Sequence, residues 1–420
     1  MEHESKKQIV FLEPFPEIMF YKMARLLKSK GYSVVSIRLL ENKDSDEFYR
    51  DGFDKILSFN LRYFGLKLKN LPKIFSFFIM KTPHFLKTIS QINKLRPYIV
   101  ISRAGPSWPS ALARIILRKT PLVYFPYDIR SAACKTEKVR KKRGIHMFDI
   151  KAERFCFEHA DGIMHKGHPD ELNFLEGDLL GHNLKLPPNQ LSFHPYASKE
   201  FIVPLNKNKI SKKDKEIHVV HLDSSGAAGP WGGAYIYDYI RKIINQKIHV
   251  HNYSKSNAIS QEELFKSFEQ CGFYQAYKDV LTSEYFHRHK SLDPKKIILE
   301  SSKYDFGIAP TPENKNLEET PDLKFTIGNK LATYIEAGIP VILESKATFT
   351  ADLVEKYKIG ILHDKNILEN LKKVIKKTSY KELEKNLLKA RGGYGMEGNF
   401  QRLESFIKSA HDYFFRKKSR

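Results

Sequence analysis

Short runs of apolar residues recur along the chain and alternate with stretches in which apolar residues return every three or four positions. The first pattern is typical of strands buried on both faces, and the second of amphipathic helices. In the first half these patterns predict helices over 16–30, 84–95 and 108–117, and strands over 8–12, 33–39, 98–102, 122–125 and 162–165. Alternating strands and helices favour a parallel sheet covered on both faces.

A second series of the same kind follows residues 205–215, a polar, lysine-rich segment that is typical of an interdomain linker. It predicts strands over 217–222, 248–252, 306–309, 340–343 and 360–362, and helices over 233–245, 294–302, 329–337, 351–357, 368–376 and 398–415. We therefore expect an α/β protein with two doubly wound, Rossmann-like domains, residues 1–204 and 216–396, followed by a helix and basic tail over 397–420. Two such domains form a crevice for ligands at the carboxyl ends of their strands.

The positive charge of the chain is concentrated in one region. The 420 residues include 71 Lys and Arg against 48 Asp and Glu, a formal net charge of +23. Residues 55–143 contain twenty basic residues and two acidic ones, Asp128 and Glu137. Solvated surfaces usually mix both signs, so this region indicates an anionic partner.

Aromatic and aliphatic residues alternate with lysines over 63–80, which is the composition of an interfacial amphipathic segment. Contact with an anionic membrane surface competes here with burial of the same apolar residues in an ordinary core. Nucleic acid is a third possibility, but the sequence contains no zinc finger, RNP-type or helix-turn-helix signature. We therefore expect an anionic membrane surface as partner of residues 55–143, and no nucleic acid.

Cysteine and histidine spacing argues against a metal or disulfide framework. Cys134, Cys156 and Cys271 lie far apart, without a C-x-x-C pair, and the sixteen histidines show no H-E-x-x-H spacing. Reduced thiols fit the cytoplasm. No apolar run approaches the roughly 20 residues of a membrane-spanning helix. We expect no bound metal or cofactor, and peripheral attachment at the inner membrane face.

The segment 328–342 reads as a loop, a helix, a tight turn and a buried strand. Gly328 and Asn329 open the helix, with Asn329 as its expected cap, and Lys330 adds a positive charge to the first turn. A helix start of this kind binds phosphate, because its unpaired N–H groups and dipole point at the anion. The alternative is a plain helix–strand junction.

At this segment the chain resembles the GT-B glycosyltransferases of group 1, family-4-like, which often carry N-K-L-x-E-Y-x-x-A-G-x-P-V-I here. Residues 304–310 resemble the family's strand that begins at an Asp and ends in Pro, and 285–289 with 294–302 resemble the elements beside the nucleotide base. Residues 160–164 and 398–415 resemble the strand closing the acceptor domain and the helix that crosses back to it.

The resemblance implies GT-B architecture with two Rossmann-like domains facing a cleft, and metal-independent transfer of a sugar from a nucleotide-diphospho-sugar. The second domain would hold the donor and the first the acceptor. Basic groups and helix starts would neutralise the leaving diphosphate. His289 falls in the segment that flanks the base.

One departure from the family concerns two glutamates, whose positions are occupied here by Phe325 and Thr333. The second glutamate usually holds the ribose hydroxyls. Thr333 or Glu336 is a candidate for that role, and Glu313 for the role of the first glutamate. Otherwise the donor is held differently or activity has been lost.

A glycine-rich segment over 223–233 follows the first strand of the second half and opens a helix. Gly226, Gly229 and Gly232 let the backbone approach a ligand closely, so we expect this segment to line the donor diphosphate. It is not a G-x-G-x-x-G motif, and a flexible surface loop is the alternative.

Ionisable residues after strands of the first half are candidates for acceptor chemistry. Asp128 follows the strand 122–125, and we expect it to be ionised and to accept a proton from, or orient, the acceptor hydroxyl. An ion pair with Arg130 or Arg103 is the alternative. Arg103, Arg130 and His165 are the candidate acceptor-binding residues, Arg103 as a phosphate ligand.

The sequence therefore predicts a glycosyltransferase that moves a sugar from a nucleotide-diphospho-sugar to a lipid-linked or surface-polysaccharide acceptor at the cytoplasmic membrane face. The rival readings are a GT-B nucleotide-sugar-binding protein without turnover, a basic nucleic-acid-binding protein, and a GT-B-type epimerase or phosphorylase.

Overall fold

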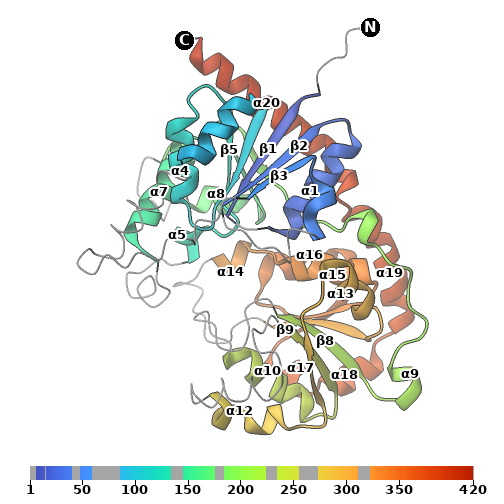
Figure 1. Ribbon diagram of the computed structural model, residues 1–420. Helices are drawn as coiled ribbons and strands as arrows, with labels where there is room; N and C mark the ends of the chain where they lie inside the picture. Colours follow the sequence, from blue (N-terminus) through green and yellow to red (C-terminus); the bar gives the residue numbers. More distant parts are fainter. Residues whose placement is uncertain are drawn as a thin grey trace. The chain divides into compact units, whose positions relative to one another are not determined.

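The computed structural model describes residues 6–14, 16–39, 48–58, 86–133, 145–175, 184–223, 234–254, 273–310 and 322–419. The chain divides into two compact units (Figure 1). The first unit comprises Met1–His194 and Asn399–Arg420, and the second comprises Pro195–Gly398.

A seven-stranded parallel sheet forms the centre of the first unit, in the order β3-β2-β1-β4-β5-β6-β7. Apart from the two edge strands, its residues are almost all buried, as expected for a sheet covered on both faces. The strands are β1 (Gln8–Glu13), β2 (Ser33–Arg38), β3 (Lys55–Ser58), β4 (Ile99–Arg103), β5 (Leu122–Phe125), β6 (Gly162–His165) and β7 (Gln190–Ser192).

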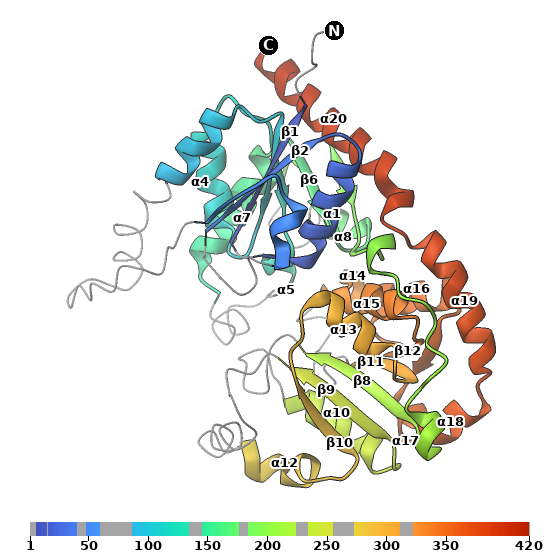
Figure 2. The same ribbon diagram turned by 45° about the vertical axis from the view of Figure 1, so that its right-hand side comes forward.

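Helices cover both faces of this sheet. Figure 2 shows α1 and α20 on one face and α4 and α7 on the other. The main apolar cluster lies between the sheet and α4 and α7, and also includes Ile89 and Ile92 of the helical residues 86–95. The helices are α1 (Ile18–Ser29), η1 (Arg50–Gly52), α4 (Trp108–Ile116), α5 (Arg130–Ala133), α7 (Met147–His159), α8 (Asp170–Phe174) and α20 (Phe400–Lys418).

The second unit repeats this topology with a six-stranded parallel sheet in the order β10-β9-β8-β11-β12-β13. Counted from its own first strand, the order is 3-2-1-4-5-6, the same as for the first six strands of the first unit and that of a doubly wound dinucleotide fold. The strands are β8 (His218–Asp223), β9 (His249–Ser254), β10 (Phe286–Lys290), β11 (Phe306–Ala309), β12 (Val341–Glu344) and β13 (Gly360–His363).

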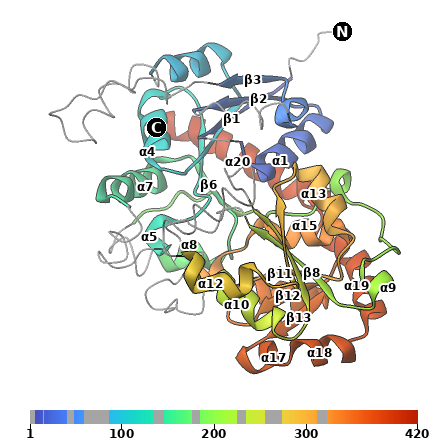
Figure 3. The same cartoon turned by 60° about the horizontal axis from the view of Figure 1, so that its bottom comes forward.

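Helices again flank the second sheet on both sides, with α10 and α12 on one side and α13 and α15 on the other (Figure 3). The helices are η3 (Lys199–Phe201), α9 (Ser211–Asp214), α10 (Ala234–Ile244), α12 (Phe273–Leu281), α13 (Pro294–Ser301), α14 (Asp322–Phe325), α15 (Asn329–Ala337), α16 (Thr348–Tyr357), α17 (Lys365–Glu369), α18 (Leu371–Lys377) and α19 (Tyr380–Gly393). The 3-10 turn η4 (Glu397–Asn399) leads into α20.

Residues 205–215 differ from the expected linker, because they are docked on the second unit. The buried Lys209 ammonium donates to the carbonyls of Ser302 and Tyr304, each at 2.9 Å. Ser211, at the start of α9, donates its hydroxyl to Asp305 at 2.6 Å. The lysine-rich composition that suggested a linker thus includes a lysine whose charge is satisfied by backbone carbonyls.

The helix α20 packs on the sheet of the first unit. It buries Leu403, Phe406, Ile407, Ala410 and Phe414. A Cβ atom at Gly162 of β6 would lie 3.0 Å from the Phe406 ring and 3.1 Å from Ala410. Glycine at this position therefore allows the helix to approach the strand closely.

Candidate functional site

The strand order reverses at one point in each sheet, between β1 and β4 and between β8 and β11. Ligands of doubly wound folds bind at the carboxyl ends of the strands beside such a point. Glu13 and Arg103 end β1 and β4 in the first unit. In the second unit, His221 lies near the end of β8 and Lys330 lies on α15.

The helix α15 is fixed against the second sheet by Tyr334, whose hydroxyl donates to the carbonyls of Ile308 at 2.9 Å and Val220 at 3.3 Å. A Cβ at Gly307 would lie 2.5 Å from the Tyr334 ring, so glycine is required for this contact. The N-cap residue is Gly328, and Asn329 is the first helical residue instead of the expected cap. Because glycine has no side chain, the cap residue itself does not cover the first N–H groups of α15.

Lys330 extends from the first turn of α15 to the end of β8. Its ammonium lies 3.3 Å from Nε2 of His221, and Nδ1 of His221 lies 2.9 Å from the amide oxygen of Asn252. The amide oxygen accepts only, so Nδ1 of His221 carries the proton and Nε2 accepts from Lys330. His221 and Asn252 are fully buried. The chain Lys330–His221–Asn252 therefore positions a cation beside an N–H-rich helix start.

Several other helices begin with a carboxylate that accepts from their first N–H groups. Such a start is already neutralised and does not attract phosphate. The helices and their carboxylates are α1 (Glu17), α4 (Asp149), α5 (Glu153), α13 (Asp293) and α17 (Asp364). By contrast, α15 has no acidic residue in its first turn and carries Lys330 there.

The other residues predicted for the donor site lie in different surroundings in the structure. The Thr333 hydroxyl donates to the carbonyl of Asn329 at 3.2 Å, within α15. Glu336 is fully buried, and its Oε1 accepts from the backbone N–H of Ser198 at 2.8 Å. His289 lies on β10, 3.0 Å from His251. Gly226, Gly229, Gly232 and Glu313 lie outside the described residues.

In the first unit, two cations stack on one aromatic ring. The guanidinium of Arg103 lies 4.4 Å from the ring centre of Tyr127, and the Lys166 ammonium lies 3.9 Å from the same centre. Lys166 also pairs with Asp128 at 2.7 Å. Arg103, Tyr127, Asp128 and Lys166 thus form a cation–aromatic cluster, built from residues at or just after the ends of β4, β5 and β6.

Asp128 is 64% exposed in this cluster. Desolvation alone would raise the pKa of Asp128, but the Lys166 ammonium, followed by Arg103 and Arg130, outweighs it and lowers the pKa below its usual value. An ionised Asp128 with a low pKa is a poor proton acceptor, and its charge suits the orientation of a hydroxyl better. The pairing partner is Lys166, which the sequence analysis had not proposed.

Arg130 and His165 make other contacts. Arg130 pairs with Asp149 at 2.8 Å, and that carboxylate also accepts from the first N–H groups of α4. His165 is buried, with Nδ1 at 3.1 Å from Glu171. Both side chains therefore have structural partners within the first unit.

A buried charged pair that was not predicted from the sequence, Glu13 and Arg38, lies beside the first switch point. Oε1 of Glu13 accepts from the Ser36 hydroxyl at 2.6 Å and from Nε of Arg38 at 3.3 Å. Burial raises the pKa of Glu13 to about 7, although Arg38 and Arg103 act in the opposite direction. A carboxyl with a pKa near neutrality at the carboxyl edge of such a sheet is a candidate proton carrier. The sequence does show this pair indirectly, because a charged residue ends each of the two buried strands: Glu13 ends β1 and Arg38 ends β2.

The basic region is only partly described, since residues 59–85 and 134–144 lie outside the described ranges. Within the described part, Arg103, Arg114 and Arg130 contact Tyr127, Asp161 and Asp149. Other basic side chains there are exposed, namely Lys55, Lys87, Lys94, Arg96, Arg118 and Lys119. Among the described residues, no helix is long and apolar enough to cross a membrane, and no three His, Cys, Asp or Glu side chains converge as a metal site.

Residues 248–393, within the second unit, match the family model described as "Glucosyltransferase 3-like, C-terminal domain". A comparison with curated proteins finds no match.

Solved structures similar to the whole chain include sucrose-phosphate synthase from Thermosynechococcus elongatus, with 13% identity over 96% of this chain and 98% of that one and a TM-score of 0.64. Anabaena HepE in complex with UDP and glucose shows 14% identity over 96% and 100%, with a TM-score of 0.62. Glycyrrhiza uralensis UGT73P12 shows 11% identity over 99% and 98%, with a TM-score of 0.56. The chain therefore has the GT-B fold that the sequence analysis predicts.

Proposed function

We propose that this protein is a glycosyltransferase that moves a hexose from a nucleotide-diphospho-sugar to a lipid-linked or surface-polysaccharide acceptor at the cytoplasmic membrane face. The match of residues 248–393 to a glucosyltransferase-like domain and the GT-B fold support the reaction class. The observation that carries the donor site is the start of α15, where the N-cap is a glycine and Lys330 lies 3.3 Å from His221 at the end of β8.

In the proposed reaction, the bond between the sugar C1 and the β-phosphate oxygen breaks and a bond to the acceptor oxygen forms. The acceptor hydroxyl loses its proton, and the nucleoside diphosphate leaves with added negative charge. Lys330 and the first N–H groups of α15 stabilise that charge without a bound metal. Thr333, at the next turn of α15, is our candidate for the ribose hydroxyls, since Glu336 already accepts from Ser198.

UDP-glucose is the first donor to test, because HepE was solved with UDP and glucose and with UDP-glucose. The glycine-rich segment and Glu313 remain predictions for the diphosphate and the sugar. For the acceptor, Arg103 and Lys166 of the cation–aromatic cluster offer two cations to a phosphate, and Asp128 offers a carboxylate to a hydroxyl.

The donor site is tested with Lys330→Ala, using Lys372→Ala as the matched control. Lys372 donates to the carbonyl of Lys247, which lies just before β9. This is the amino end of the strands, whereas the proposed donor site lies at their carboxyl ends. Hydrogen bonds to charged groups contribute about 1.5–3 kcal/mol, so Lys330→Ala should weaken UDP binding about ten- to a hundredfold in calorimetry. Lys372→Ala should bind as the wild type does. Absence of UDP binding to the wild type, or equal affinities of both variants, contradicts the site.

A GT-B nucleotide-sugar-binding protein without turnover is the second candidate. Phe325 and Thr333 at the two usual glutamate positions favour it, as does the contact of Glu336 with Ser198. The distinguishing experiment incubates the wild type with radiolabelled UDP-glucose and a membrane extract. Saturable UDP-glucose binding, with neither donor hydrolysis nor label in any acceptor, would support this candidate over the transferase.

A further inference from the structure

Five histidines share one face of three neighbouring strands in the second unit, and we call them the histidine ladder: His218, His249, His251, His287 and His289. The register pairs His218 with His249 and His251 with His287 across the strands. Side chains two residues apart on a strand point to the same face, so His249 with His251, and His287 with His289, complete one continuous row.

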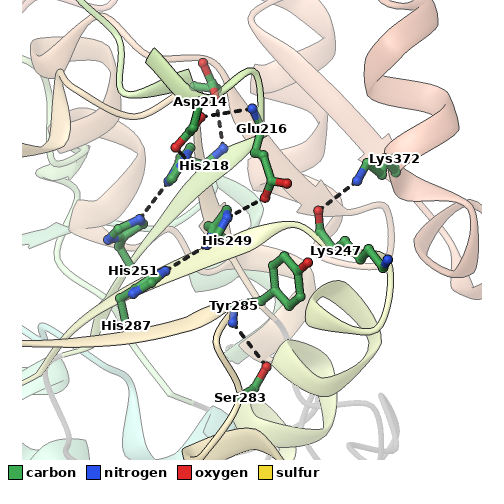
Figure 4. Close-up of polar contacts among 11 residues, drawn as sticks. Asp214, Glu216, His218, Lys247, His249, His251, Ser283, Tyr285, His287 and Lys372 are labelled. Atoms are coloured by element: carbon green, nitrogen blue, oxygen red, sulfur yellow. Dashed lines mark hydrogen bonds and ion pairs between the residues drawn. The ribbon is translucent and has the colours of Figure 1, made fainter. Parts of the chain in front are cut away.

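The ladder forms two hydrogen-bonded chains, each ending on a carboxylate. Figure 4 shows the first chain from Asp214 to His251 and the second from Glu216 to His287. In the first chain, Asp214 lies 2.9 Å from Nε2 of His218, Nδ1 of His218 lies 2.9 Å from Nε2 of His251, and Nδ1 of His251 lies 3.0 Å from Nε2 of His289. In the second chain, Glu216 lies 2.5 Å from Nε2 of His249, whose Nδ1 lies 2.8 Å from Nε2 of His287.

The carboxylates set the direction of both chains. An ionised carboxylate only accepts, so the nearest ring donates through Nε2–H. A neutral imidazole has a single N–H, so Nδ1 of that ring must accept from the next ring. The same reasoning applies to each following ring. In the neutral ladder every histidine therefore carries its proton on Nε2, and Nδ1 of His289 and of His287 is the acceptor at the outer end.

Four carboxylates face the ladder, and one of them, Glu300, is paired with Lys303. The carboxylates that face it are Asp214 of α9, Glu216, Glu300 of α13 and Asp305. The phenols of Tyr253, Tyr285 and Tyr304 pack on its rings, and Lys209 binds the Tyr304 carbonyl. These surroundings favour the uptake of positive charge at the carboxylate ends.

We propose that the histidine ladder is a proton-binding site, in which each chain takes up one proton at its carboxylate end and thereby gives the second unit a pH-dependent stability. This inference involves the second unit alone and does not rest on the proposed transferase activity.

Proton uptake by the first chain conserves every hydrogen bond. A proton from water binds Nδ1 of His289, which passes its Nε2 proton to Nδ1 of His251. That ring passes its own Nε2 proton to Nδ1 of His218. His218 becomes an imidazolium beside Asp214, and the two outer rings stay neutral with the proton now on Nδ1. A second proton would make two N–H groups face each other, so the chain accommodates one.

The burial of the ladder supports this limit. Burial, and then the neighbouring imidazoles, lower the pKa of His251 to about 2 and that of His287 to about 4, and burial also lowers the pKa of His289. An unfolded histidine has a pKa of about 6.5. Below that pH the unfolded chain binds protons that these folded rings do not. The folded state therefore has its full stability above about pH 6.5 and loses it as the pH falls toward the folded pKa values, about tenfold in the folding constant per pH unit for each ring held neutral.

Nitrogen NMR of the full chain, labelled with 15N-histidine, tests the proposed tautomers directly. As the pH falls from 8 to 5, His251 and His289 should stay neutral and change from the Nε2–H to the Nδ1–H form, while His218 becomes a cation. Retention of the Nε2–H form by His251 and His289 throughout, or their titration to cations near pH 6.5, would overturn the proposal.

Urea unfolding across the same pH range tests the consequence for stability, with Asp214→Asn as the variant and Asp279→Asn as the control. Both aspartates are about half exposed (42% and 59%), but Asp279 pairs with Arg241, away from the ladder. Asp214→Asn removes the charge that holds the proton, so its stability should fall more steeply below pH 6.5 than that of the wild type. Asp279→Asn should run parallel to the wild type.

Parallel curves for Asp214→Asn and the wild type would refute a proton held beside Asp214. The described residues contain no three His, Cys, Asp or Glu groups that converge on a metal position. If Zn²⁺ at pH 7.5 raised the melting temperature of the wild type and not that of His251→Gln, the ladder would be a metal site and the proton assignment would be wrong.

Discussion

At the scale of single residues, the start of α15 differs from those of α4 and α5. Where Asp149 or Glu153 accepts from the first N–H groups, the positive helix end is neutralised by the chain itself. At α15 a glycine and a lysine take that place. We therefore expect an anion to bind at the start of α15 and not at the starts of α4 and α5.

Gly338 is a residue at which backbone strain and packing act together. It ends α15 with φ +71°, and an added Cβ would lie 2.6 Å from both Arg391 Nη2 and Leu205 Cδ2. Arg391 donates to the carbonyls of Ile335 and Glu336, so it cannot move without losing those bonds. Gly338→Ala should cost about 2–4 kcal/mol in urea unfolding, of which left-handed strain supplies about 1–2 kcal/mol.

Gly31→Ala is the matched control, because Gly31 follows α1 with φ +91° and has nothing within 4 Å of an added Cβ. It should cost only the strain, about 1–2 kcal/mol. If both substitutions cost the same, the contact with Arg391 contributes nothing, and our account of Gly338 fails.

Part of the candidate site is predictable residue by residue. Lys330 could be predicted as a candidate phosphate ligand, because its position in the first turn of a helix is a local property of the sequence. The roles of Lys166 and Glu13 could not be predicted in this way. Lys166 acts through Asp128 and Glu13 through Arg38, and only the pairing of strands brings these partners together. The histidine ladder could not be predicted for the same reason. Each of its histidine–histidine hydrogen bonds joins two different strands.

At the scale of elements, the predictions were most accurate for buried strands, because a continuous run of apolar residues can be recognised directly in the sequence. The edge strand β10 has the sequence Phe-His-Arg-His-Lys, and only the family resemblance pointed to it. The short edge strands β3 and β7 were not predicted, because their sequences, Lys-Ile-Leu-Ser and Gln-Leu-Ser, are too short to show an apolar run. The helix α7 also lacked a readable pattern, because its buried side includes Asp149 and Glu153 beside Cys156 and Phe157.

The packing of α20 can be tested with two adjacent phenylalanines. Phe414 is 2% exposed and Phe415 is 47% exposed. Phe414→Ala empties a packed position next to Arg114, so it should lower the free energy of unfolding by about 3 kcal/mol. Phe415→Ala should change it by no more than about 1 kcal/mol. Similar losses for both, measured by urea unfolding, would mean that α20 does not pack on the sheet as described.

At the scale of the whole molecule, the uneven charge predicts where an anionic membrane is contacted. Lys87, Lys94, Arg118 and Lys119 are exposed in the first unit. Changing all four to Gln should weaken flotation with anionic phosphatidylglycerol vesicles at least about tenfold, since each basic residue near such a surface contributes about 1 kcal/mol. Neutral phosphatidylcholine vesicles should bind neither protein.

The control variant changes Lys365, Lys373, Lys376 and Lys377, exposed lysines of the second unit, to Gln. It removes the same net charge, so equal losses for the two variants would show that total charge and not its location governs binding. A salt-dependent affinity for DNA above that for the vesicles would identify nucleic acid as the anionic partner.

The chain leaves the first unit at residue 194 and returns to it at residue 399. During synthesis on a ribosome, the whole second unit therefore emerges before α20 is available. Until then the sheet face that α20 covers, including Gly162 of β6, lacks its partner helix. Completion of the first unit is thus a late step, and a chain interrupted after residue 398 would present an uncovered apolar surface to chaperones and proteases.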